Sequence, residues 1–210
     1  MVTKLALDDD WRDFSQGSFS ERDVDVLDLI SREALARFTF DGLKRRLGIH
    51  PETLSRILNR LEQEGFVEKG VEGYKVTSKI NDYAELRSAN DNKDCLPLLQ
   101  TFIPSNVSTD QLVQSLRGKW FGMLRWFGFA QDEEGITLKW ITEDGGIQVN
   151  ANISEASLAI TAKFLRENNF NTALTASYQL MATISRLCQR KQLIKHVGYF
   201  GDYGLFLTPA

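Results

Sequence analysis

The sequence predicts an α+β protein in which a small helical unit with a β-ribbon precedes an antiparallel sheet with packed helices. Three observations indicate this. Apolar residues recur at helical spacing through residues 20–63. Two short alternating segments around a glycine-containing turn follow at 66–78. From residue 119, three strand-like segments separated by turns lead into two segments with helical patterns.

The composition is that of an ordinary soluble protein. The chain has 210 residues, of which 42% are hydrophobic and 25% charged. No apolar run approaches the roughly 20 residues that span a bilayer, and the N-terminus does not resemble a secretory signal. Two distant cysteines and two isolated histidines give neither a disulfide framework nor a metal-ligand spacing. We therefore expect a cytoplasmic protein with no cofactor, no metal and no membrane contact.

Charge is distributed unevenly. The net charge is −3, which argues against a protein that coats chromatin. Residues 37–79 nevertheless carry nine Lys and Arg against six Asp and Glu. This local basic excess falls on the helical unit.

Three helices are predicted in that unit. The first begins at Ser20, a favourable N-cap, and its apolar spacing continues through Leu35 to Phe38. The second covers 40–47 and ends at Gly48. The third runs from Pro51 to Gln63, with proline in the first helical position, where its missing N–H costs nothing. Its apolar stripe consists of Leu54, Ile57, Leu58 and Leu61.

The order of helix, short helix, glycine turn, amphipathic helix and β-ribbon resembles a winged helix-turn-helix. Residues 20–79 are similar to the DNA-binding domains of winged-helix transcriptional regulators of the broad MarR/ArsR type. The match rests on Leu43 and Leu47, on Gly48 and Ile49 at the turn, on the stripe of the third helix, on Gly65 and on the ribbon through Val76. The resemblance covers under a third of the chain. It implies that the third helix enters the major groove of duplex DNA.

Candidate DNA-binding residues lie on the polar side of the third helix and on the basic segments beside it. Arginine binds guanine and asparagine binds adenine with paired hydrogen bonds, whereas lysine and arginine on flanking elements suit phosphates. His50 is expected to cap the third helix or to lie near a phosphate. The candidates are Lys44, Arg45, Arg46, His50, Thr53, Ser55, Arg56, Asn59, Arg60, Lys69 and Lys75.

The polar face has a second interpretation, because amphipathic helices usually present only a solvated surface. Glu52 occupies the end of the helix that should enter the groove, where it either accepts from cytosine or complements the helix dipole. Four further glutamates crowd the ribbon side: Glu62, Glu64, Glu68 and Glu72. Acidic ribbons of this kind also suit a winged helix that binds another protein.

The second half is predicted to follow a linker at 81–94, rich in Asn and Asp. A short helix is expected near 108–117, then strands within 119–130, 135–143 and 146–154. Gln148, Asn150 and Asn152 alternate with apolar residues, which predicts a sheet with one solvated face. Helices are expected at about 154–168 and 172–190, then a hairpin turning at 201–204.

The first of these strands is apolar on both faces. Trp120, Leu124 and Trp126 fall on one face, and Phe121, Met123, Phe127 and Phe129 fall on the other. Burial of both faces in the core is favoured over a small-molecule pocket lined by aromatic rings. Trp120, Arg125, Trp126 and Trp140 are the candidate ligand or interface residues.

The sequence as a whole favours a transcriptional regulator that is not an enzyme. We expect a polar tail at 1–17, a winged helix at 18–80, a linker at 81–94 and an α+β domain at 95–210 for dimerisation or for sensing a ligand or partner. Duplex DNA, a second copy of the chain and a small-molecule effector are the expected partners. The alternative is an interaction protein within a transcription or replication assembly. An enzyme in the second half has only the aromatic strand in its favour, since no catalytic motif is present.

Overall fold

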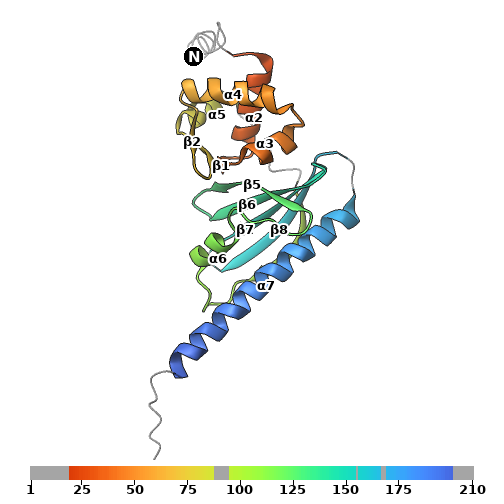
Figure 1. The fold of residues 1–210 in the computed structure, drawn as a ribbon. Coiled ribbons are helices and arrows are strands. Elements are labelled where there is room, and N and C mark those ends of the chain that lie inside the picture. The colour runs from red at the N-terminus through yellow and green to blue at the C-terminus, as the bar shows by residue number, and fades with distance from the viewer. Residues whose placement is uncertain (1–18, 88–94, 155, 167–168, 201–210) are drawn as a thin grey trace, which may run out of the picture.

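The computed structural model describes residues 19–87, 95–154, 156–166 and 169–200. The N-terminal part lies on one side of a β-sheet, and a long C-terminal helix crosses the other side (Figure 1). All strand pairs are antiparallel, and the eight strands are ordered β2-β3-β1-β5-β6-β7-β8-β4. A single sheet therefore runs through both halves of the chain.

The N-terminal part is a winged helix-turn-helix, as predicted. Thr39 caps the short helix, and Gly48 ends it in the left-handed conformation, with φ of 65°. In chain order the elements are α2 (Glu21–Arg32), β1 (Leu35–Phe38), α3 (Phe40–Leu47), α4 (Pro51–Gln63), β2 (Val67–Gly70), β3 (Gly73–Val76) and α5 (Lys79–Arg87).

The first helix is shorter than the sequence predicts. It ends at Arg32, and the chain reverses at Ala34, whose φ is 48°. Leu35 and Phe38 are buried as expected, but from a strand. The backbone of Phe38 pairs with both β3 and β5, whereas that of Leu35 pairs with β5. Apolar spacing alone does not distinguish a helix from a strand here, because pairing with residues about 90 positions away decides the backbone conformation.

The second half is an antiparallel sheet with helices on the face away from the winged helix (Figure 1). Its main core packs the sheet against α6 and the first part of α7, through residues such as Leu112, Leu116, Trp140, Leu180 and Ile184. The elements are β4 (Leu96–Phe102), α6 (Thr109–Leu116), β5 (Leu124–Gln131), β6 (Ile136–Thr142), β7 (Ile147–Ile153), β8 (Ser157–Phe164) and α7 (Phe170–Phe200).

Two predicted elements of this half are wrong. The segment expected as a helix at 154–168 contains β8, which pairs with β7 and β4 and buries the alternating residues Leu158, Ile160 and Ala162. Strand β4, which lies at the sheet edge, was not predicted from the sequence. Residues 193–200, expected in a hairpin, continue α7, and the predicted turn at 201–204 lies outside the described residues.

The predicted linker at 81–94 begins inside a helix. Helix α5 covers Lys79–Arg87 and buries Ile80 and Tyr83 beside α2, where the Tyr83 hydroxyl donates to Asp28. Residues 88–94 of the predicted linker and the predicted polar tail lie outside the described residues. The division into units at 18–80 and 95–210 stays a prediction, since both contribute strands to one sheet.

A bulge in β5 interlocks the two halves. The pairing of β5 with β6 shifts register between Trp126 and Gly128, so the extra residue Phe127 turns into the winged-helix core. Trp126 and Phe129 pack into the core of the second half, although the sequence placed Phe127 and Phe129 on the same face. The strand is nonetheless buried on both faces, as predicted.

Close backbone contact at this bulge requires glycine. The Thr39 N–H donates to the Phe127 carbonyl at 2.8 Å. A Cβ placed on Gly128 would lie 2.2 Å from the Arg37 carbonyl oxygen and 2.9 Å from the Phe38 Cα. These atoms belong to the β1 backbone, so no side-chain rotation relieves the clash.

We therefore expect Gly128→Ala to lower the free energy of unfolding by about 1–3 kcal/mol, as overpacking of a close contact does. Gly70→Ala is the matched control, because its Cβ would meet nothing closer than 3.6 Å. Urea denaturation of both variants measures the difference. Equal stability of the two variants would contradict the close approach of β1 and β5.

Candidate nucleic-acid interface

Helix α4 is held by one apolar side and leaves its polar side uncovered. Leu54, Ile57, Leu58 and Leu61 are at most 1% exposed. His50 caps the helix, as expected, by accepting the Glu52 N–H at its Nδ1 (3.4 Å), and Pro51 takes the first position. The helix lies on the side of the winged helix away from β5 and β6 (Figure 1). The second half, within the described residues, therefore does not block it.

The outer face of α4 carries groups that donate and accept hydrogen bonds. Ser55, Arg56 and Asn59 are exposed, and Thr53 is half-buried beside them. Arg56 binds Glu52 one turn earlier at 2.5 Å, but both side chains are about two-thirds exposed. Exposed pairs of this kind contribute about 1 kcal/mol or less, so Arg56 is able to exchange Glu52 for another partner at low cost.

Arg60 differs from Arg56 because it is tied to a buried carboxylate. Its Nη2 lies 2.5 Å from Asp23 Oδ1, and its Nε lies 3.2 Å from both carboxylate oxygens. Asp23 has no exposed surface. Burial alone would raise the pKa of Asp23, but hydrogen bonds from Arg60 and Ser20 lower it overall. Arg60 therefore joins α4 to the start of α2 in addition to any contact with DNA.

The wing formed by β2 and β3 carries Lys69 and Lys75, both exposed. Lys75 lies 3.7 Å from Glu68, and the Lys69 N–H donates to Glu62 on α4 at 3.2 Å. The tip residue Val71 is fully exposed. The wing thus places two cations and an apolar tip beside the outer face of α4.

The basic run at the end of α3 divides between two environments. Lys44 and Arg45 lie near the surface, where Lys44 pairs with Asp41 at 2.9 Å and Arg45 donates to the Asp41 carbonyl at 3.4 Å. Arg46 points inward, and only 17% of its side chain is exposed. It donates to Gln148 at 3.2 Å and to Glu33 at 3.5 Å. Its assignment as a phosphate contact is therefore corrected.

Arg46 belongs to a buried polar cluster between the winged helix and the sheet. Glu33 follows α2, is 5% exposed and accepts hydrogen bonds at 2.8 Å from Lys139 and from Gln148. Arg46 and Lys163 approach its other oxygen at 3.5 and 3.6 Å. Burial alone would raise the pKa of Glu33, but Lys139, Gln148 and Lys163 together lower it to about 2.

Sequence patterns missed this cluster because its members looked solvent-facing. Gln148, Asn150 and Asn152 were predicted on a solvated face, yet Gln148 is fully buried and Asn150 is 6% exposed. The winged helix covers that face, and only Asn152 is exposed. Lys139, between Leu138 and Trp140 in a largely apolar strand, was the one local signal of a buried charge that needs a partner.

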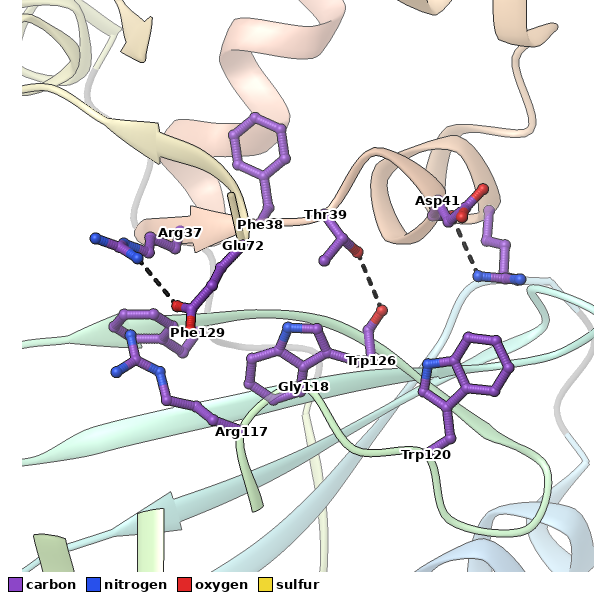
Figure 2. Close-up of a pocket in the computed structure, with 11 residues that line it drawn as sticks. Arg37, Phe38, Thr39, Asp41, Glu72, Arg117, Gly118, Trp120, Trp126 and Phe129 are labelled. Carbon is purple, nitrogen blue, oxygen red and sulfur yellow. Dashed lines mark hydrogen bonds and ion pairs between the residues drawn. The ribbon is translucent and has the colours of Figure 1, made fainter. Parts of the chain in front are cut away.

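The candidate ligand or interface residues of the second half also divide between the surface and the core. Trp120 and Trp126 line a cleft of about 280 Å³ between the two halves, together with Arg37, Phe129 and Arg117 (Figure 2). Trp140 is fully buried and donates to the Lys119 carbonyl at 2.9 Å, so its assignment as a ligand residue is wrong. Arg125 binds Glu143 at 2.9 Å and lies over the Trp120 ring.

The arrangement of α3, α4 and the wing defines a winged-helix regulator segment, and comparison with known families agrees. Residues 19–70, from the start of α2 to the end of the first wing strand, match the model of the MarR family. The match covers about a quarter of the chain and is consistent with a winged helix-turn-helix regulator segment at these residues. Comparison of the chain with curated proteins gave no match.

Within the described residues, no helix is long and apolar enough to cross a bilayer. No three His, Cys, Asp or Glu side chains in that part of the chain lie together as a metal site.

The Glu33 cluster predicts acid sensitivity. Because the pKa of Glu33 is about 2 in the folded chain and 4.5 when unperturbed, its stabilisation is complete above pH 4.5 and is lost as the pH falls toward 2. The difference between these two pKa values corresponds to about 3 kcal/mol in the free energy of unfolding. We expect Glu33→Gln to lose about this much stability at pH 7 and to approach the wild type in acid, as measured by urea denaturation across pH.

Glu143→Gln serves as the control for that series, because Glu143 also pairs with an arginine but is 70% exposed. Its stability should stay near that of the wild type at every pH. A Glu33→Gln variant as stable as Glu143→Gln at pH 7 would exclude a stabilising role for the cluster.

Proposed function

We propose that the protein regulates transcription by inserting α4 into the major groove of duplex DNA. The uncovered polar face of α4 between its flanking cations carries this proposal. A B-DNA major groove accommodates one α-helix, and side chains on the helix face read the base edges. The family match to residues 19–70 supports the same assignment.

The residues divide into two roles. Arg56 and Asn59 read bases, with Ser55 and Thr53 in support, because these side chains lie on or beside the exposed face of α4. Cations on the flanking elements contact phosphates and fix the register of the helix without reading sequence. The proposed phosphate-binding residues on the flanking elements are Lys44, Arg45, Lys69 and Lys75, and α4 adds His50 at its N-cap and Arg60.

The second half is proposed to pair two copies of the chain and to sense a ligand. A single recognition helix reads only a few base pairs, and pairing extends the sequence that is read. The cleft lined by Trp120 and Trp126 supports ligand sensing, because a small molecule bound there would touch both halves at once (Figure 2). The site of action would be the cytoplasm.

A docking module for another protein is the competing function. The acidic residues of the wing support it, since Glu64, Glu68 and Glu72 are exposed. Failure to bind any member of a random duplex library, together with co-purification of a protein partner, would favour that function over DNA binding.

Binding to duplex DNA should weaken steeply with added salt. Each neutralised phosphate contributes about 0.9 to the slope of log K against log salt, so four to six contacts predict a slope of about −4 to −5. Fluorescence anisotropy with a labelled duplex across a salt series measures it. A flat response would contradict contact with the DNA backbone.

Two substitutions separate base reading from phosphate contact. Arg56→Ala should cost about 1–3 kcal/mol on the preferred duplex and much less on unrelated sequences. Lys69→Ala should weaken binding to all sequences alike and reduce the salt slope by about 1. Competition binding against a selected and a scrambled duplex makes the comparison. A uniform loss in both variants would place α4 outside the groove.

A further inference from the structure

A notch lies beside α4, on the flank that faces the start of α2. Its volume is about 270 Å³. Three arginine side chains meet there, two from α4 and one, Arg22, from the first turn of α2. Arg22 is not among the DNA-binding residues predicted from the sequence. The notch is lined by Ser20, Arg22, Thr53, Arg56, Ile57 and Arg60.

Arg22 and Arg60 both retain donors for a ligand. Arg22 is exposed, and no described residue pairs with it. Arg60 binds Asp23 through Nε and Nη2, which leaves Nη1 with no hydrogen bond to any residue that the structure describes. Because Asp23 fixes the guanidinium of Arg60, that group is held in place at the notch before any ligand arrives.

The backbone at the start of α2 does not supply the binding groups. The Ser20 N–H and hydroxyl both donate to Asp23, at 2.7 and 2.8 Å. The acids in contact with the notch arginines are Asp23, which is buried, and Glu52, which is exposed and paired with Arg56. Three guanidinium groups against two carboxylates leave an excess of positive charge.

The notch and the wing lie on opposite edges of the exposed face of α4. At 100° per residue, Thr53, Arg56 and Arg60 form one edge and Ser55 and Glu62 the other. The wing is attached at the second edge, where the Lys69 N–H donates to Glu62. A helix in the major groove has a phosphate backbone on each side.

We propose that Arg22, together with Nη1 of Arg60, binds a phosphate of the duplex DNA backbone on the side of the groove opposite the wing. This phosphate contact rests on the proposed function and adds to it a second edge of α4 that is anchored to the DNA backbone. The wing and the notch then hold the two walls of one groove, with the base-reading face of α4 between them. The ligand is a phosphodiester, which guanidinium groups bind with paired, charge-assisted hydrogen bonds.

Arg22→Ala tests the proposal without disturbing the fold, because Arg22 is exposed, whereas removing Arg60 would leave Asp23 buried without its cation. The control is Arg32→Ala at the other end of α2, where Arg32 is exposed and donates to the Asp28 carbonyl. Anisotropy titrations of the full chain with one labelled duplex, from about 50 to about 200 mM KCl, give the affinity and the salt slope.

Arg22→Ala should weaken binding about eightfold at about 0.1 M salt and reduce the slope by about 0.9, the effect of one lost phosphate contact. The loss should be equal on selected and scrambled duplexes, and Arg22→Lys should recover most of it. Arg32→Ala should match the wild type.

If the wild type binds DNA and Arg22→Ala binds with the same affinity and slope, the notch assignment is wrong and the proposed function stands. If Arg22→Ala and Arg32→Ala lose affinity equally, the effect is one of total charge and the notch assignment is again wrong. If the wild type binds no duplex at any salt, both proposals fail together.

Discussion

Strand β1 determines how the two halves of this protein are joined. Arg37 and Phe38 pair with β3 of the wing, and Leu35, Arg37 and Phe38 pair with β5 of the second half. Both edges of the strand are thereby used, and the winged helix becomes part of an eight-stranded sheet. The bulge at Phe127 and the close approach at Gly128 follow from this pairing, because a side chain of the second half fills the core of the first.

The buried cluster at Glu33 adds an electrostatic constraint to the same junction. One carboxylate from the end of α2 meets Lys139 and Lys163 from the sheet and Arg46 from α3. Removing any partner from such a cluster leaves buried charge uncompensated, so the cluster favours one arrangement of the halves over others. The same contacts explain why Arg46, although it lies beside the proposed DNA surface, is not part of that surface.

The sequence predicted the winged helix well because local signals determine it. The N-cap at Thr39, the left-handed Gly48 and Pro51 at the first position of α4 each act within one helical turn. The errors fell where distant pairing decides the structure. Residues 35–38 and 157–164 carry spacings that suit a helix or a strand, and only their partner strands select the strand.

The predictions for the candidate site divide in the same way, between features set by local sequence and features set by distant contacts. The exposed face of α4 was predictable from its periodicity, and the structure leaves that face uncovered. The inward turn of Arg46 and the burial of Gln148 were not, because each depends on which surface of the sheet the winged helix covers. The position of Arg22 beside Arg60 depends likewise on packing between α2 and α4, which sequence spacing does not encode.

If two copies of this chain bind one operator as proposed, the shared sheet restricts how they bind it. Where a flexible linker joins a DNA-binding domain to a dimerisation domain, each DNA-binding domain is able to rotate and tolerates variable gaps between half-sites. Here the winged helix is hydrogen-bonded to the second half of the chain through β1 and β5. One inserted base pair moves a half-site by about 3.4 Å and rotates it around the duplex axis, and the pairing of β1 with β5 would oppose a matching movement of the winged helix. Under the proposed pairing, the length of the spacer between half-sites should therefore matter as much as the bases that are read.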